Sequence, residues 1–263
     1  MTNLWTEHTI KLPDGIELLY TDSGAPNTAD YTTMVVFHGT GFNGYGFARV
    51  HEYAHEHNMR TIVCNRRGYR GSTKYTDDEL ADIQAGRKIF QDRLAVQTAW
   101  LLKYLVEEEN TPKVTPDGAG GGCILMGWSW GNATVLALLA DPAVIPRQVY
   151  QTIKPYLRSL VLYDPPFLAL GYPRPPLHGV YDPFNDPDCV TGEQVYDNFR
   201  HWVTSYYDHP DIESGNPAGM SFEKRTSNRT ISRWTEEEKA RYCDTLSAVE
   251  SDLPGSVNWL PLN

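Results

Sequence analysis

The sequence predicts an α/β protein built on a doubly wound, mostly parallel sheet that is followed by a helical region. Two observations support this fold class. Four continuous apolar runs alternate with segments of helical character, and continuous runs fit strands that are buried on both faces of a parallel sheet. One of these runs leads directly into Gly127-Trp128-Ser129-Trp130-Gly131 and then into a helix-forming stretch. Strands that alternate with helices form a doubly wound sheet, because each parallel crossover covers a face of the sheet.

The expected elements follow one another in a regular order. Alternating residues on either side of Pro13-Asp14-Gly15 predict an antiparallel hairpin of residues 7–11 and 16–20. The apolar runs predict buried strands at 34–37, 62–64, 123–126 and 160–163. Helices are expected between these strands at 45–56, 88–108 and 132–140. In the second of these helices, one apolar face is formed at helical spacing by Phe90, Leu94, Leu101 and Leu105.

The chain changes character after residue 166. Residues 167–193 are dense in proline, glycine and aromatic residues, and two further helices are expected at 194–208 and 235–252. The first of these carries an apolar stripe of Val195, Phe199, Trp202, Val203 and Tyr206. The second opens on Thr235 followed by three glutamates, as a capping box does. We therefore expect a core at 1–166 followed by a helical region at 167–263.

Composition argues against several classes of partner. The length of 263 residues fits one large domain, or one domain with an insertion. A net charge of −10, from 33 acidic and 23 basic residues, disfavours nucleic acid or an anionic membrane as a partner. Residues 1–8 lack the features of a signal peptide, and no apolar stretch approaches the roughly 18 residues that cross a bilayer. Four widely spaced cysteines favour reduced thiols. We expect a soluble, cytoplasmic protein.

The pentapeptide around Ser129 has the form of a nucleophile elbow. A serine between two glycines, leaving a strand and entering a helix, is held in a strained and exposed position. The turn is so tight that the positions two before and two after the serine approach neighbouring backbone, where a Cβ would collide. Gly127 and Gly131 occupy these positions. Ser129 is therefore the candidate nucleophile.

Three signatures together resemble the α/β-hydrolase fold family. In the order of that family, His38-Gly39-Thr40-Gly41 follows the third strand, Asn65-Arg66-Arg67-Gly68-Tyr69-Arg70-Gly71-Ser72 follows the fourth, and the elbow follows the fifth. The resemblance covers about residues 7–166, and it implies that the helical region at 167–263 is the family's cap, or lid. It implies that the backbone N–H groups of Thr40 and Trp130 form the oxyanion hole. Two such fixed donors would each stabilise the anion that forms on an attacked carbonyl by about 3 to 4 kcal/mol.

Neighbouring charged residues of these signatures have simpler interpretations. The resemblance implies that His38 supports the loop that follows it, so proton transfer is not assigned to it. The cluster of Arg66, Arg67 and Arg70 has the composition of an anion site. We interpret it as a solvated turn in which one arginine packs against the loop.

The chain departs from the family pattern at its C-terminal end. In the family, a seventh strand with the catalytic acid and an eighth followed by the catalytic histidine come after the lid. Here nine residues follow Pro254, and no histidine follows His209. The expectation is thus a hydrolase fold that is incomplete at its C-terminal end. A serine without a base is a poor nucleophile, and in a characterised serine hydrolase loss of the base costs on the order of a millionfold in turnover.

Three interpretations of this departure stay open. The chain could be a shortened form of a working hydrolase. Alternatively, the triad could be completed from within, with Asp164 after the sixth strand as the acid and His178, His201 or His209 of the cap as the base. Asp164-Pro165-Pro166 is also a common way to end a strand. The third interpretation is a degenerate, inactive domain that at most binds a small apolar ligand.

The functional expectation follows from the resemblance. It is hydrolysis of an ester or similar acyl bond through a Ser129 acyl-enzyme. The expected partner is a small, apolar or aromatic substrate, held at a mouth formed by Trp128, Trp130, Tyr163 and Phe167. No metal or organic cofactor is expected. The nearest approach to ligand spacing is His51, His55 and His57, which we interpret as the exposed face of a surface helix.

Overall fold

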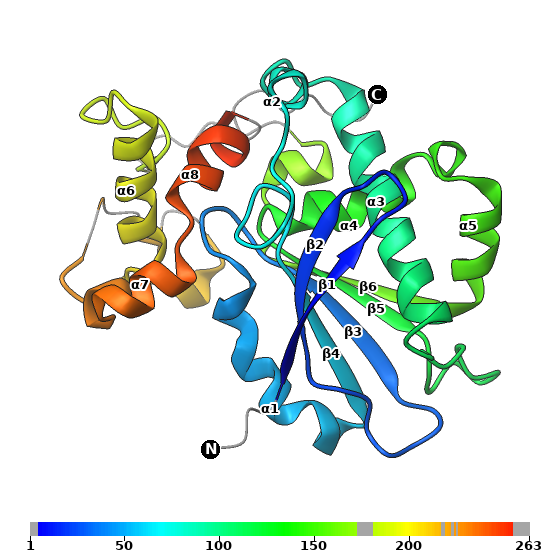
Figure 1. The fold of residues 1–263 in the computed structure, drawn as a ribbon. Coiled ribbons are helices and arrows are strands. Elements are labelled where there is room, and N and C mark those ends of the chain that lie inside the picture. The colour runs from blue at the N-terminus through cyan, green and yellow to red at the C-terminus, as the bar shows by residue number, and fades with distance from the viewer. Residues whose placement is uncertain (1–4, 173–180, 217–218, 222–223, 225, 255–263) are drawn as a thin grey trace.

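The computed structural model describes residues 5–172, 181–216, 219–221, 224 and 226–254. Within these residues, six strands form one sheet in the order β1-β2-β4-β3-β5-β6 (Figure 1). The strands are β1 (Thr6–Lys11), β2 (Glu17–Asp22), β3 (Thr32–Phe37), β4 (Met59–Cys64), β5 (Cys123–Trp128) and β6 (Leu157–Tyr163). β1 and β2 are antiparallel, and β3 to β6 are mutually parallel. The predicted hairpin and the four predicted parallel strands are confirmed.

Helices connect the strands. They are α1 (His51–Ala54), α2 (Asp77–Gln84), α3 (Lys88–Glu107), α4 (Gly131–Ala140), α5 (Arg147–Ile153), α6 (Gly192–Val203), α7 (Glu236–Tyr242) and α8 (Thr245–Ser247). Of these, α3 and α4 lie where helices were predicted, whereas α2 and α5 were not predicted. The predicted helix at 45–56 is instead a 3-10 helix (Gly44–Val50), one α-helical turn and a second 3-10 helix (His55–His57). Among the described residues, no helix has both the length and the apolar character that crossing a bilayer requires.

Alternation along the strands divides the sheet into two packed faces. The face under α3 and α4 carries residues such as Tyr20, Val35 and Phe37, which belong to the main hydrophobic core. The predicted apolar face of α3 is confirmed, because Phe90, Leu94, Leu101 and Leu105 are all buried in this core. The opposite face carries Thr21 and Thr61, and both contact His51 of α1.

β6 forms one edge of the described sheet. Its side chains Val161, Leu162 and Tyr163 are 38–53% exposed, although strands of this type are usually covered on both faces. The chain turns at Asp164 directly after this strand.

The helices α6, α7 and α8 lie together to one side of the sheet, apart from α3, α4 and α5 (Figure 1). A second, smaller hydrophobic cluster joins them to the loop after β3, and its buried members are Phe42, Tyr196, Phe199, Ala248 and Leu253. The capping box predicted at Thr235 is confirmed, with reciprocal bonds between Thr235 and Glu238.

Two predictions for this region are wrong in detail. The helix expected at 194–208 ends at Val203, where the Thr204 hydroxyl turns back to the carbonyl of Arg200. Tyr206 is therefore beyond the helix and 57% exposed, and Tyr196 is packed in its place. The single helix expected at 235–252 is split at Cys243 into α7 and α8, followed by a π-helix (Ala248–Asp252). Cys243 has extended backbone because it pairs with Phe42 in an antiparallel bridge.

Candidate active site

The elbow around Ser129 has the strained geometry that its glycines allow. Ser129 has a φ of +49°, a left-handed conformation that residues other than glycine rarely adopt. Its N–H donates to the carbonyl of Tyr163 at 3.0 Å, which ties the turn to the end of β6. A Cβ on Gly127 would lie 2.6 Å from the backbone N of Asn132, and one on Gly131 would lie 2.2 Å from the carbonyl oxygen of Phe37. Both glycines are therefore required by close backbone approach.

The loop after β3 lies directly beside this serine. A Cβ built on Gly39 would be 3.0 Å from the Cβ of Ser129. In the same loop, the N–H of Gly41 donates to the hydroxyl of Tyr69 at 2.8 Å. The N–H of Thr40 has no hydrogen-bond partner among the described residues. The N–H of Thr40, which is the predicted donor from this loop, is thus available, whereas the N–H of Gly41 is already bonded to Tyr69.

Trp130 lies at the start of α4, one residue after the serine. The first N–H groups of a helix have no intrahelical acceptor, and the helix dipole places partial positive charge there. A half-buried serine therefore faces the positive end of a ten-residue helix on one side and the Gly39–Thr40 loop on the other. An oxyanion would be stabilised in this position.

His38 is fully buried beneath the loop. Its Nε2 accepts from the N–H of Arg66 at 3.0 Å, and its Nδ1 lies 2.9 Å from the carbonyl oxygen of Gly39. Burial, with the Arg66 charge as a second cause, holds the pKa of His38 well below its usual value. The ring is therefore neutral, carries its proton on Nδ1, and has no free nitrogen for proton transfer.

A buried ion pair completes the support of the loop. Arg66 donates to the carbonyls of His38 and Gly39 at 2.9 and 3.1 Å, and it pairs with Asp252 at 2.6 Å. The hydroxyl of Tyr69 also donates to Asp252. Asp252 belongs to the last described helical segment, so that segment is joined to the loop through Arg66 and Tyr69.

The interpretation of the arginine cluster as a solvated turn is therefore wrong for two of its members. Arg66 and Arg67 are buried, and Arg67 pairs with Glu79. The turn is drawn into the core because each guanidinium has a carboxylate partner. One arginine, Arg66, does pack against the loop as expected, and Arg70 is exposed.

The cap holds the same loop from the other side. The hydroxyl of Tyr196 in α6 and the N–H of Asp244 donate to the carbonyl of Gly41 at 2.7 and 2.9 Å. Gly41 has a φ of +72°, and a Cβ there would lie 2.2 Å from the Tyr196 ring. The N–H of Asn43 donates to the carbonyl of Tyr242 at 2.9 Å. The loop is thus fixed between the core and the cap.

Asn132 links the elbow to the end of β6, and sequence reasoning had missed it. Its amide donates to the carbonyls of Ser129 and Tyr163 at 2.8 and 3.0 Å, while its Oδ1 is buried without a partner among the described atoms. Tyr196 and Asp252 were missed as well. Asn132 could have been noticed because it lies three residues after Ser129. No local pattern marks Tyr196 or Asp252, because they are 155 and 186 positions away from their partners Gly41 and Arg66.

Asp164 directly follows Tyr163, whose carbonyl accepts from the N–H of Ser129, but none of the remaining candidate residues that the structure describes is hydrogen-bonded to the hydroxyl of Ser129. Asp164 follows β6 with a φ of +48°, is exposed, and makes no hydrogen bond or ion pair with a described residue. The hydroxyl of Ser129 makes no hydrogen bond within the described part of the chain either. His201 contacts Asp197 on its own helix, and Nδ1 of His209 accepts from the N–H of Ser221. His178 lies outside the described residues.

The expectation for the histidines of 51–57 is partly wrong. His55 and His57 are exposed, but His51 is buried and bonds to the hydroxyls of Thr21 and Thr61 at 2.8 and 2.7 Å. Burial lowers the pKa of His51 to about 4. Within the described part of the chain, no group of three histidine, cysteine or acidic residues is placed to hold a metal ion.

An aromatic cavity of about 410 Å³ opens beside the elbow. It is lined by Phe42, Asn43, Gly46, Phe47, Trp128, Tyr163, Val203, Thr204, Ser205, Tyr206, Thr230, Trp234 and Tyr242. Trp128 and Tyr163 are thus at the mouth as expected. Trp130 is buried at the start of α4 and Phe167 is 53% exposed, and neither is among the lining residues.

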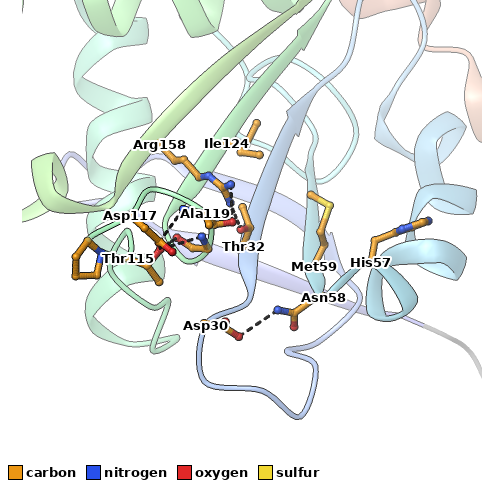
Figure 2. Close-up of a pocket in the computed structure, with 12 residues that line it drawn as sticks. Asp30, Thr32, His57, Asn58, Met59, Thr115, Asp117, Ala119, Ile124 and Arg158 are labelled. Carbon is orange, nitrogen blue, oxygen red and sulfur yellow. Dashed lines mark hydrogen bonds between the residues drawn. The ribbon is translucent and has the colours of Figure 1, made fainter.

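A larger hollow of about 700 Å³ lies at the opposite, amino ends of the parallel strands (Figure 2). Its polar groups are engaged with one another. Arg158 donates to the hydroxyl of Thr32 and the carbonyl of Ala119, and Asp117 accepts from the Thr115 hydroxyl. Its described lining residues include no serine, cysteine or lysine. The candidate site is therefore the elbow and its aromatic cavity.

The strand order and the strand-turn-helix elbow define this protein as an α/β-fold protein of the hydrolase type. A model of the alpha/beta hydrolase family matches residues 34–257, and the chain belongs to that family. A search of curated proteins found no match.

Solved structures share the fold at low sequence identity. The epoxide hydrolase CorEH superposes with a TM-score of 0.57 at 14% identity, over 97% of this chain and 74% of its own. The epoxide hydrolase VrEH1 from Vigna radiata gives 0.54 at 14%, over 97% and 73%. A candidate aryl esterase from Burkholderia cenocepacia gives 0.50 at 18%, over 94% and 72%. These identities show the fold and leave the reaction to be argued from the site.

Proposed function

We propose that this protein is a serine hydrolase that acts on an ester or related acyl bond of a small, apolar or aromatic substrate. Oγ of Ser129 attacks the carbonyl carbon, and the N–H groups of Thr40 and Trp130 hold the oxygen that becomes negative. The proton of the Ser129 hydroxyl passes to the departing alkoxide through a base that the described residues do not supply, so the alcohol leaves and an acyl-serine remains. Water then hydrolyses the acyl-serine to the carboxylic acid and restores the Ser129 hydroxyl. The free cysteines support the expectation of a reducing, cytoplasmic setting.

The main support for the proposal is the left-handed backbone conformation of Ser129. A non-glycine residue held at a φ of +49° costs on the order of 1 to 3 kcal/mol. Such strain persists only where the surroundings impose the conformation. Here it is imposed by the close backbone packing at the two glycines of the elbow and by the hydrogen bonds of Ser129 with Tyr163 and Asn132. The result is a serine placed beside the Gly39–Thr40 loop.

The identity of the nucleophile favours acyl bonds over epoxides. Attack by a carboxylate on an epoxide gives an ester, which water can hydrolyse to regenerate the enzyme. Attack by a serine oxygen would give an ether, which does not hydrolyse under the same conditions. Attack by serine on an ester gives another ester, so turnover can be completed. We therefore do not propose epoxide hydrolysis for this chain, although epoxide hydrolases are among its structural neighbours.

Replacing Ser129 with alanine tests the proposal. We expect wild-type protein to be labelled by a fluorophosphonate probe and to hydrolyse p-nitrophenyl acetate, and Ser129→Ala to lose both. The matched control is Ser159→Ala, which removes an exposed hydroxyl from β6. It should be labelled as the wild type is. Equal hydrolysis by wild type and Ser129→Ala would reject the nucleophile assignment.

A second candidate function is a hydrolase-like domain that binds a small apolar ligand without turning it over. The observation in its favour is that each described histidine bonds elsewhere, as His38, His201 and His209 do. A folded wild-type protein that no fluorophosphonate labels, but that binds apolar ligands, would support this alternative.

A further inference from the structure

The wall of the cavity beside the elbow is a continuous series of aromatic rings. Phe47 meets Trp128 edge-on at 5.5 Å between centroids, and Phe42 lies 6.4 Å from Trp128 and 6.2 Å from Trp234. Trp234 in turn lies 5.2 Å from Tyr242. Trp128 directly precedes the nucleophile. The aromatic wall therefore begins at the reacting group and continues into the cap.

The cavity offers no charge to a ligand. None of its described lining residues is ionisable near neutral pH. Its non-aromatic polar side chains already hold bonds within the chain: Asn43 to Arg241, Thr204 to Arg200, Ser205 to His201 and Thr230 to Tyr206. Two arginines stack on tyrosines of the lining, Arg233 on Tyr206 and Arg241 on Tyr242, but neither arginine is among the lining residues. An anion in the cavity would lose water without gaining a cationic partner among the lining residues.

We propose that this cavity binds a neutral aromatic ring of the substrate, next to the bond that Ser129 attacks. The place of the ring within a substrate rests on the proposed function, whereas its binding does not. A volume of about 410 Å³ falls within the range of ligand pockets, so a one-ring or two-ring group fits. Ring against ring in an edge-on or offset arrangement is favoured over an alkyl chain of equal area.

Ligand binding without chemistry tests the cavity directly. We expect isothermal titration calorimetry to show 2-naphthol binding to the wild-type chain at least about tenfold more tightly than 2-naphthoate, which has the same rings and a carboxylate. Tyr206→Ala and Trp234→Ala should weaken 2-naphthol binding about threefold to tenfold. Tyr206 is 57% exposed, so its replacement should not disturb folding. The matched control Phe167→Ala removes an exposed ring outside the cavity and should change binding less than twofold.

Equal or tighter binding of 2-naphthoate would overturn the proposal, because the stacked arginines would then dominate. Unchanged 2-naphthol binding in both Tyr206→Ala and Trp234→Ala would overturn it as well.

Hydrolysis separates this inference from the proposed function. We compare 2-phenylethyl acetate with hexyl acetate and methyl 3-phenylpropanoate with methyl heptanoate, so that the ring is on the alcohol side in one pair and on the acyl side in the other. In at least one pair, kcat/KM should favour the ring by about threefold to tenfold, and Tyr206→Ala should remove the preference. Hydrolysis by Ser129 with no preference in either pair would refute the cavity proposal alone. Selective naphthol binding without any hydrolysis would refute the proposed function alone.

Discussion

Ser129 keeps its position through contacts made by small neighbours. The backbone of Gly131 passes against the carbonyls of Phe37 and His38, and Asn132 binds the carbonyls of Ser129 and Tyr163. The left-handed conformation of the serine is the consequence of these approaches, because a wider turn would break them. At the scale of single residues, the candidate site is therefore defined as much by absent Cβ atoms as by the nucleophile.

Gly131→Ala should destabilise the fold strongly. Its new Cβ would lie 2.2 Å from the carbonyl oxygen of Phe37, a backbone atom that cannot rotate away. We expect a loss of about 2 to 4 kcal/mol in the free energy of unfolding, measured by urea denaturation. Gly46→Ala is the control, because nothing lies within 4 Å of a Cβ there, and we expect no loss or a small gain. Similar losses in both variants would contradict the steric account.

His51 should make stability depend on pH. Its pKa is lowered to about 4 by burial, against 6.5 in the unfolded chain. The unfolded state therefore binds the extra proton first, so the contribution of His51 is complete above pH 6.5 and is lost as the pH falls toward 4.

The comparison that isolates this effect is His51→Gln. Between pH 7 and pH 4.5, the free energy of unfolding should fall by about 2 to 3 kcal/mol more in the wild type than in the variant. Urea denaturation at the two pH values measures the difference. His38, whose pKa is also lowered by burial, keeps part of the dependence in both proteins. Parallel pH profiles would show that His51 is not the source.

The loop after β3 is the element on which core and cap converge. Its Gly41 binds Tyr69 of the core through the N–H, and Tyr196 and Asp244 of the cap through the carbonyl. Thr40, whose N–H is available, is the residue directly before Gly41. A shift of the cap relative to the core would therefore change the position of the Thr40 N–H, the proposed oxyanion donor.

Tyr196→Phe should expose this coupling. The change removes one hydrogen bond to the Gly41 carbonyl and leaves the Asp244 bond in place. We expect a stability loss of about 1 kcal/mol. If the loop moves, kcat should fall about threefold to tenfold with KM unchanged, because oxyanion contacts act in the transition state.

Tyr53→Phe, at a half-exposed position on α1, is the matched control and should change neither quantity. A Tyr196→Phe enzyme that is less stable but has an unchanged kcat would limit Tyr196 to a structural role.

At the scale of the whole molecule, the turn after β4 contacts the last described helical segment through Asp252. Asp252 is almost fully buried and accepts from both Arg66 and Tyr69. Removing one partner of a buried pair leaves an uncompensated charge, which is far more costly than losing an exposed pair.

Asp252→Asn should therefore cost about 3 to 5 kcal/mol in the free energy of unfolding. Glu236→Gln is the control, because it breaks an ion pair with Lys239 in which Glu236 is largely exposed; we expect a change below about 1 kcal/mol. Chemical denaturation of both variants gives the comparison. Equal, small effects would mean that water reaches Asp252 in the folded protein.

Much of the core was predictable because its signals are local. The apolar runs of β3 and β5, the apolar face of α3 and the capping box at Thr235 each lie within a few residues of chain. The predictions were wrong where the conformation or burial of a residue depends on a partner outside its own segment of chain. The buried state of Arg67 depends on Glu79, and the break after α7 depends on Phe42. The assignments of Ser129, Thr40, Trp130 and Asp164 to catalytic roles stay predictions.

The amino-acid pattern alone predicted the hairpin, the four parallel strands, the elbow with its obligatory glycines and membership of a hydrolase fold, since each depends on short-range periodicity and backbone space. The three-dimensional fold was needed to show which loop amide stays available and that Asp252 and Tyr196 hold that loop. It was also needed to show that Trp128 and Tyr163, but not Trp130 or Phe167, line the cavity. The physical reason is that hydrogen-bond satisfaction and desolvation depend on partners brought together by the whole fold, which no local pattern specifies.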